Sequence, residues 1–138
     1  KTNISSVGDD SGLIVPAINN EPGLYSARYA GVNATDSDNR NKLISKLKDR
    51  KLESTYAYFF CCIVAVGIKG QNEIIVCDGR IEGEVRTIER GEKGFGYDPM
   101  FYPRGYSESF AELSSLEKNK ISHRGQALKK LMDKLNKT

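Results

Sequence analysis

Aromatic and β-branched residues are concentrated in the middle of the chain, over residues 56–68. A run of this length and composition predicts a central β-strand. Residues 69–72 predict a turn, residues 73–78 a second strand, and residues 80–87 a third. The expected result is a meander of antiparallel strands.

Before this meander, apolar residues recur at helical spacing and predict a helix over residues 36–49. Thr35 is a good N-cap, and Asp38 three residues later completes a capping-box pattern. Leu43, Ile44 and Leu47 supply one apolar face, and lysines near the end favour the negative pole of the helix dipole.

Two further helices are expected at the end of the chain. Ser114 begins a capping-box pattern for the first, and Ser122 is suited to cap the second. The second helix has an apolar face formed by Leu128, Leu131, Met132 and Leu135.

Three segments have weaker periodicity. Residues 4–18 predict an extended segment that is interrupted by a functional turn at residues 9–12. Residues 19–34 are typical of a loop, with Asn, Pro and Gly at several positions. Residues 90–106 are rich in glycine and aromatic residues and predict an ordered loop system with no regular element.

Composition limits the possible classes. A chain of 138 residues, 38% hydrophobic and 28% charged, fits one globular domain over residues 1–138. The net charge of +3, with scattered lysines, does not resemble a dedicated nucleic-acid binder. Cys61, Cys62 and Cys77 lie in apolar runs and are expected to be small buried hydrophobes. With no secretory or membrane-length apolar run, a cytoplasmic location is expected, with neither nucleic acid nor membrane as a partner.

The first candidate site is Asp9-Asp10-Ser11-Gly12. Adjacent carboxylates on a strand point to opposite faces, so only one is expected to face a site. Mg²⁺ takes oxygen ligands and keeps several waters, so one or two carboxylates suffice to hold it. The alternative is a plain turn, because Asp, Ser and Gly are ordinary turn residues.

The second candidate is residues 91–99, in which Phe95 and Tyr97 alternate with glycine. Glycine lets the backbone approach a ligand, and the aromatic rings could stack on a base. The alternative is a surface loop with its aromatic residues packed into the core.

The third candidate is the start of the last helix, where Ser122-His123-Arg124-Gly125 follows Lys118 by four residues. Backbone N–H groups at a helix start favour an anion or an electron-rich group, and His123 and Arg124 add side-chain donors. The alternative is a helix cap with solvated charges.

Together, the motifs resemble one family. Asp9–Leu13, Pro22–Gly31, Ala34–Asp36, Gly94–Pro99, Ala111–Leu113, Glu117–Lys118 and Ile121–Gly125 occur in the order typical of the inosine triphosphatase family, also called the RdgB-type dITP/XTP pyrophosphatases. The resemblance covers essentially the whole chain. It implies an α/β fold, with a long mixed sheet, flanking helices and two lobes around a central cleft. It also implies an Mg²⁺-dependent enzyme, commonly a homodimer, that hydrolyses ITP, dITP and XTP to the monophosphate and pyrophosphate.

The resemblance also implies the role of each site residue. Asp10 matches the catalytic carboxylate that binds the metal, and the other matching positions are substrate contacts. These contacts are Ser11, Phe95, Gly96, Tyr97, Asp98, Lys118, Ser122, His123 and Arg124.

The family pattern also has a part that this chain lacks. Its first strand, a long helix, a phosphate-binding loop of the pattern [ST]-x-N-x-x-K and a glutamate that helps hold the metal are expected to precede Lys1. An alternative function is therefore an inactive remnant that only binds nucleotide or dimerises. A nucleic-acid-binding module is a second alternative, and it would require a basic stripe.

Overall fold

In the part of the chain that the structure describes, a five-stranded sheet and three α-helices form the framework. The computed structural model describes residues 6–67 and 74–136. The strands are β1 (Ser6–Val15), β2 (Glu21–Gly23), β3 (Ser54–Val66), β4 (Ile74–Arg86) and β5 (Phe101–Pro103). The helices are α1 (Asp36–Asp49), α2 (Ser115–Ile121) and α3 (His123–Leu135).

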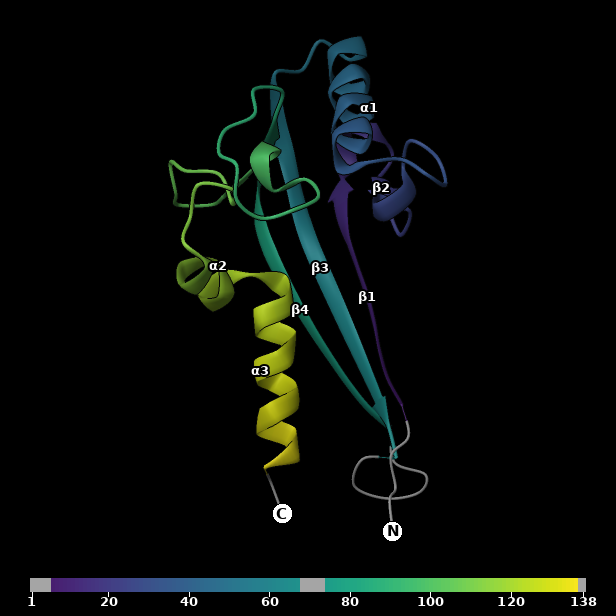
Figure 1. The fold of residues 1–138 in the computed structure, drawn as a ribbon, viewed down its shortest axis with the longest axis vertical. Helices are drawn as coiled ribbons and strands as arrows, with labels where there is room; N and C mark the ends of the chain where they lie inside the picture. Colours follow the sequence, from purple (N-terminus) through teal and green to yellow (C-terminus); the bar gives the residue numbers. More distant parts are fainter. Residues whose placement is uncertain (1–5, 68–73, 137–138) are drawn as a thin grey trace.

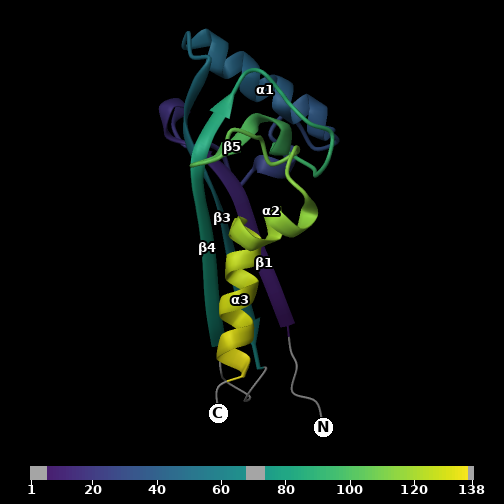
Figure 2. The same ribbon diagram turned by 90° about the vertical axis from the view of Figure 1, so that its left-hand side faces the viewer.

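The strand order is β2-β1-β3-β4-β5, and every pairing among the described strands is antiparallel. The fold is therefore α/β, as expected. The mixed sheet that the resemblance implies is not found in the described part of the chain, because all four pairings run antiparallel. Strands β3 and β4 run along the long axis of the molecule. Helix α3 lies beside one end of this pair of strands, and α1 lies near the other end (Figures 1 and 2).

Helix α1 begins and ends where the sequence predicts. Thr35 Oγ1 accepts a hydrogen bond from the Asp38 N–H, and Asp38 Oδ2 accepts one from the Thr35 N–H. This reciprocal capping box satisfies two N–H groups that the first turn would otherwise leave without a partner. Leu43 and Leu47 on its inner face are fully buried.

Several predictions about the strands are wrong. Residues 9–12 form no turn but lie inside β1, where they pair with β3. The expected second and third strands are one strand, β4, which continues through Gly79. A Cβ at Gly79 would meet the backbone of α3, so this glycine permits close helix packing rather than a break. The predicted turn at residues 69–72 lies outside the described residues.

Two predicted loops contain short regular elements. Residues 19–34 include β2 and the 3-10 helix Ser26–Arg28, and a 3-10 helix over Pro16–Ile18 joins β1 to that loop. The glycine-rich segment includes the 3-10 helix Asp98–Met100 and β5, which pairs with β4. These elements are too short to produce a hydrophobic period.

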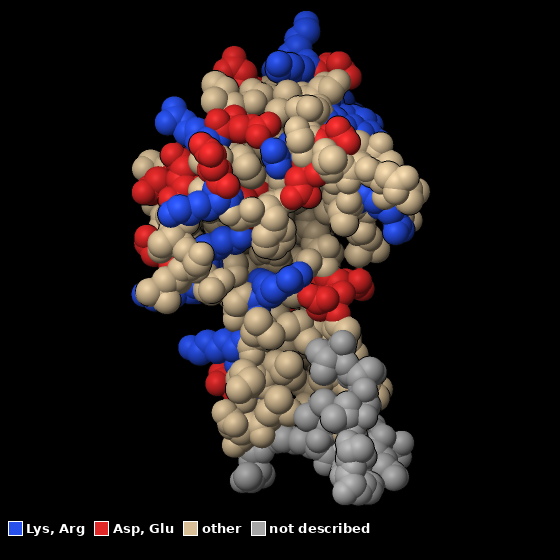
Figure 3. Space-filling view, in the orientation of Figure 1, with Lys and Arg blue, Asp and Glu red and all other residues tan. Residues whose placement is uncertain are grey.

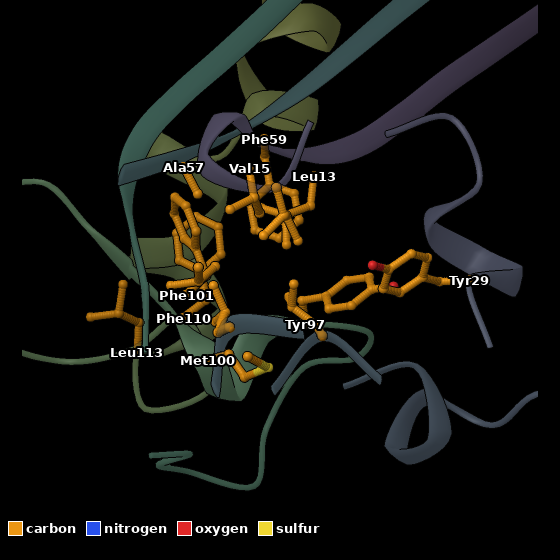
Figure 4. Close-up of a cluster of buried hydrophobic side chains, with 14 residues drawn as sticks. Leu13, Val15, Tyr29, Ala57, Phe59, Tyr97, Met100, Phe101, Phe110 and Leu113 are labelled. Atoms are coloured by element: carbon orange, nitrogen blue, oxygen red, sulfur yellow. The ribbon is translucent and has the colours of Figure 1, made fainter. Parts of the chain in front are cut away.

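The core has two parts. The first lies between the sheet, α1 and the glycine-rich segment, and Figure 4 shows its aromatic and aliphatic side chains converging from these elements. The second lies between the β3–β4 hairpin and α3, where Ala127 and Leu131 pack on Cys61 and Cys77.

Helix α3 is rotated from its predicted orientation. Leu131 is buried and Leu135 packs against the core, as expected, but Leu128 and Met132 are exposed and Ala127 is buried instead. Ser122 caps α3 as expected, with its Oγ accepting a hydrogen bond from the Gly125 N–H at 3.0 Å. Ser114 Oγ likewise accepts one from the Glu117 N–H and begins α2.

The cysteines and the charged side chains of the surface were also predicted from the sequence. All three thiols are free; Cys61 and Cys77 are buried as expected, and Cys62 is half-buried. Acidic and basic side chains are interspersed over the face in Figure 3, which shows no basic stripe there. No helix in the described residues is long and apolar enough to cross a membrane.

Candidate functional site

A cavity of about 550 Å³ lies where β1, α1, the start of α3 and residues 91–99, here called the glycine-aromatic loop, meet. Its volume falls within the usual range for small-molecule sites. All eight predicted substrate-binding side chains, and Gly96, line it. These residues are Ser11, Phe95, Gly96, Tyr97, Asp98, Lys118, Ser122, His123 and Arg124. Positions separated by more than 100 residues in sequence thus meet around one cavity.

The glycine-aromatic loop forms one wall. Gly94 and Gly96 have φ values of 78° and 61°, in the left-handed region that favours glycine. The two aromatic residues between and after them have different roles. Tyr97 is buried, and its hydroxyl donates a hydrogen bond to the Ser26 carbonyl at 2.7 Å, whereas Phe95 is 64% exposed. Tyr97 is therefore packed into the core beside the cavity, and Phe95 lies exposed at the cavity. Stacking of a base on either ring stays a prediction.

Asp98 and Lys118 bind one another in this wall. Lys118 Nζ lies 2.5 Å from Asp98 Oδ2, and the same oxygen accepts a hydrogen bond from the Phe95 N–H at 3.0 Å. Burial raises the pKa of the Asp98 carboxyl, while the Lys118 ammonium acts to lower it. Lys118 Nζ also lies 4.6 Å from the centre of the Phe95 ring. An ammonium has three donors, so Lys118 can keep this ion pair and still reach a ligand.

His123, the first residue of α3, forms part of the opposite wall. Its ring stacks on Phe59, with centroids 4.8 Å apart and planes 10° apart. Nδ1 is buried and has no hydrogen-bond partner within the described part of the chain. Burial, together with the neighbouring Arg124 and Lys118 cations, lowers the pKa of His123 to about 4. The imidazole is therefore neutral at pH 7 and presents a buried nitrogen that a ligand can satisfy.

Arg124 joins α3 to β1. Its guanidinium lies 3.1 Å from Asp9 Oδ2 and donates a hydrogen bond to Ser11 Oγ at 3.3 Å. Because side chains alternate along a strand, Asp9 and Ser11 share the face toward α3 and Asp10 points to the other face. Asp10 is exposed, does not line the cavity, and has no side-chain hydrogen bond or ion pair with any described residue.

The structure thus distinguishes the two carboxylates in a way that the sequence did not. Asp9 was not singled out as a site residue, yet it is the carboxylate that holds Arg124. The rule of alternation was available as a signal, but the partner of each carboxylate was not. The role of Asp10 stays a prediction.

The residues present offer a partial fit to Mg²⁺. Asp10 is an exposed carboxylate that forms no ion pair with any residue that the structure describes, which suits a hard cation that keeps most of its waters. The described residues contain no group of three or more His, Cys, Asp or Glu side chains that could hold a metal ion. A cation at Asp10 would therefore need water and substrate oxygens to complete its coordination.

Other cavity residues came from no predicted site. Asp36 and Asn39 reach the cavity from the first turns of α1, Ser26 and Ala27 from the loop before it, and Phe59 from β3. Asp36 lies inside the motif Ala34–Asp36, and Ser26 and Ala27 lie inside the motif Pro22–Gly31, so a usable signal existed for these three. For Asn39 and Phe59, only the folded chain reveals their position, because their local sequence is that of an ordinary helix or strand.

The chain that forms this cavity is similar in sequence to proteins of one family. A sequence model of the Ham1 family matches residues 1–134. The chain is 47% identical over 137 residues to the dITP/XTP pyrophosphatase of Idiomarina loihiensis, covering 99% of this chain and 68% of that protein. It is 50% identical over 129 residues to the dITP/XTP pyrophosphatase of Clostridium perfringens, covering 94% of this chain and 62% of that protein.

Solved structures match nearly all of this chain and about two thirds of their own length. A HAM1 protein from Coxiella burnetii superposes with a TM-score of 0.88 at 42% identity, covering 96% of this chain and 67% of that one. The Ham1 protein of Staphylococcus aureus superposes with a TM-score of 0.85 at 43% identity, covering 94% and 65%. The chain therefore spans about two thirds of the length of the relatives it matches.

Proposed function

The chain belongs to the Ham1 family, and on this premise we propose that it recognises the base of ITP, dITP or XTP for hydrolysis to the nucleoside monophosphate and pyrophosphate. The observation that carries the proposal is the cavity itself. It combines a stacking ring, Phe95, with a neutral imidazole whose Nδ1 has no partner among the described residues, and with the donors of Arg124. Relatives that share nearly half of its residues are dITP/XTP pyrophosphatases.

Selectivity follows from the chemistry of the donors. Hypoxanthine and xanthine carry a 6-oxo acceptor where adenine carries an amino donor. A guanidinium has only donors, so Arg124 suits the oxo group and would be left without a partner by adenine. The Arg124 side chain is 48% exposed in the free protein and would be covered by a bound base. A donor that is covered without gaining a partner is costly, and sites of this kind can discriminate strongly between ligands.

The base is held between two walls in this proposal. Phe95 and Tyr97 belong to the wall formed by the glycine-aromatic loop, where the Asp98–Lys118 pair fixes the loop and leaves donors of Lys118 free for substrate. His123 and Arg124 belong to the wall formed by α3, which Ser122 caps. Ser11, on β1, lies beside Arg124 and is placed to contact the sugar or phosphate end of the nucleotide.

Asp10 has the phosphate-side role. The carboxylate would hold Mg²⁺, and it would orient the attacking water or accept a proton from it. Attack of this water at the α-phosphorus would release pyrophosphate. When bound, the metal neutralises charge on phosphate oxygens and lowers the pKa of coordinated water. The exposed position of Asp10, free of any protein cation in the described chain, supports this role.

The test measures pyrophosphate release with Mg²⁺ from ITP, dITP and XTP, with ATP and GTP for comparison. It uses the 138-residue chain and the full product of the gene from which the chain comes. Release of pyrophosphate and monophosphate from the 6-oxo substrates other than GTP is expected. Failure of both proteins to release pyrophosphate would instead support a remnant that only binds nucleotide or dimerises.

The Asp10→Asn variant tests the metal-side assignment. Turnover is expected to fall by about 100-fold or more, because an amide cannot replace the charge of the carboxylate. Asp133→Asn is the control, since Asp133 is an exposed carboxylate on α3. Near-normal turnover of Asp10→Asn would remove Asp10 from the mechanism.

Two further properties are part of the proposal. A homodimer is expected from the resemblance and is checked by sedimentation equilibrium of the purified protein. A cytoplasmic location is expected because the proposed substrates belong to the nucleotide pool, and fractionation of cells that produce the protein checks it.

A further inference from the structure

The peptide groups on both sides of Gly96 are held by two side chains of one helix. The Gly96 N–H donates a hydrogen bond to Asp36 Oδ2 at 2.9 Å, and the Gly96 carbonyl accepts one from Arg40 Nη1 at 2.8 Å. Asp36 and Arg40 are four residues apart in α1 and so lie on the same face of the helix. One turn of α1 therefore grips one residue of the cavity wall from both sides.

The position of this turn is itself fixed. The capping box between Thr35 and Asp38 determines where α1 begins, so Asp36 falls in the first turn. Arg40 is held as well, because its Nε lies 2.9 Å from Glu89 Oε1 and its side chain is only 17% exposed. The guanidinium bridges Glu89 and Gly96, and a planar fork of donors makes both bonds at once.

The same turn of α1 also holds the second loop at the cavity. Asn39 is buried; its Oδ1 accepts a hydrogen bond from the Ala30 N–H at 2.8 Å, and its Nδ2 donates one to the Ala27 carbonyl at 3.1 Å. Ala27 and Gly96 both line the cavity. Helix α1 thus joins two loops that are about 70 residues apart in sequence.

The glycine-aromatic loop needs such anchors. Gly94 and Gly96 are the residues with the greatest backbone freedom, and the chain loses that freedom when the loop is ordered. Phe95 between them is mostly exposed, so little burial of its own holds it in place. Tyr97 and Asp98 anchor the far side of the loop, but among the described residues only Asp36 and Arg40 make side-chain bonds to the Gly96 backbone.

We propose that Asp36 and Arg40 are positioning residues for the base-binding wall, which hold the Gly96 backbone so that Phe95 is presented to the base. The inference rests on the proposed function and extends it to a helix that no candidate motif assigned to the base. A wall that is already ordered costs less to bind against than one that must be ordered by the ligand. Loss of either anchor should therefore weaken nucleotide binding and leave the chemical step unchanged.

The test combines steady-state kinetics with amide hydrogen exchange. Arg40→Ala and Asp36→Ala are each expected to raise KM for ITP by about tenfold with kcat within about twofold, because ground-state and transition-state binding fall together. Exchange of the segment that contains Gly96 is expected to become faster in both variants. Arg50→Ala is the matched control: Arg50 follows the last residue of α1 and donates a hydrogen bond to the Ala17 carbonyl at 2.9 Å. Ala17 belongs to the 3-10 helix Pro16–Ile18, which does not line the cavity.

Conservative variants separate positioning from folding. Asp36→Asn keeps an acceptor oxygen for the Gly96 N–H and should retain near-normal KM and exchange, whereas Arg40→Lys can reach Glu89 or Gly96 but not both and should fall between wild type and Arg40→Ala. Unchanged exchange at Gly96 in Arg40→Ala would overturn the proposal, as would a fall in kcat at constant KM or an equal effect of Arg50→Ala. If the wild-type protein hydrolyses no ITP, the proposed function fails, and the exchange measurement still decides whether α1 holds the loop.

Discussion

The buried imidazole of His123 makes the stability of the protein depend on pH. Burial lowers the pKa of His123 from 6.5 to about 4 in the folded protein. The unfolded chain therefore binds a proton at a pH where the folded protein does not. Stability is fully present above pH 6.5 and is lost as the pH falls toward 4, because protons favour the state that binds them.

The size of the effect follows from the same pKa values. Each unit of pKa difference between the two states corresponds to about 1.4 kcal/mol, and between pH 7 and pH 5 the loss integrates to about 2 kcal/mol. The ring is half-buried, so partial access of solvent reduces this to about 1 to 2 kcal/mol. With a urea dependence of about 1–3 kcal/mol per molar, the unfolding midpoint should fall by roughly half to one molar.

The assay is urea unfolding followed by circular dichroism at pH 7 and pH 5, with His123→Phe as the comparison. Phenylalanine can keep the stack on Phe59 but cannot take up a proton. Asp98, whose pKa is raised by burial, is present in both proteins, so its own titration cancels in the difference. The wild type should lose about 1 to 2 kcal/mol more than the variant on acidification. An equal loss in the two proteins would refute the assignment of this pH dependence to His123.

Two further changes test the packing of the site. Gly79→Ala should lower the free energy of unfolding by about 1 to 3 kcal/mol, because the added methyl would meet the backbone of α3 at His123. Gly8→Ala, with no heavy atom within 4 Å of its added Cβ, is the control in the urea titration, and equal midpoints for the two variants would contradict this packing. Lys118→Met should cost about 3 kcal/mol at pH 7, because it leaves the buried Asp98 carboxylate without its cation. Lowering the pH should restore part of that loss by protonating Asp98, and a loss that does not change with pH would contradict the ion-pair explanation.

Local sequence signals predicted the helices better than the strands. The start of α1 depends on contacts between Thr35 and Asp38, which are three residues apart, so the sequence is sufficient to place it. The continuity of β4 through Gly79 depends on α3 packing against that glycine from more than 40 residues away. No local pattern around Gly79 distinguishes this from a break between strands.

About half of the residues that line the cavity were predicted, but their bonding to one another was not. The family resemblance assigned Phe95, Lys118 and His123 as substrate contacts, and the structure brings them to one cavity. The pairing of Asp98 with Lys118, and of Asp9 with Arg124, depends on how separate elements approach one another. Such pairings decide which side chain is available to a ligand, and spacing along the chain does not determine them.

The orientation of α3 shows the same limit. Four apolar residues at helical spacing predicted one inner face, but the helix buries Ala127 and Leu131 and leaves Leu128 exposed at the cavity. Ala127 was overlooked because its small side chain contributes little to a hydrophobic pattern. Its size is what allows α3 to lie close to β4 at Gly79, since a close approach favours small side chains on both elements.

In the proposed function, the cavity recognises the 6-oxo group of a purine base through the donors of Arg124. Isothermal titration of the protein with IMP and with AMP tests it most directly, because the two ligands share a ribose and a phosphate and differ at the base. IMP should bind at least about tenfold more tightly than AMP, since a base that covers Arg124 without accepting a hydrogen bond from it is disfavoured. Arg124→Ala should remove most of that difference. Equal affinity for IMP and AMP in the wild-type protein, or a preference that survives Arg124→Ala, would contradict the account.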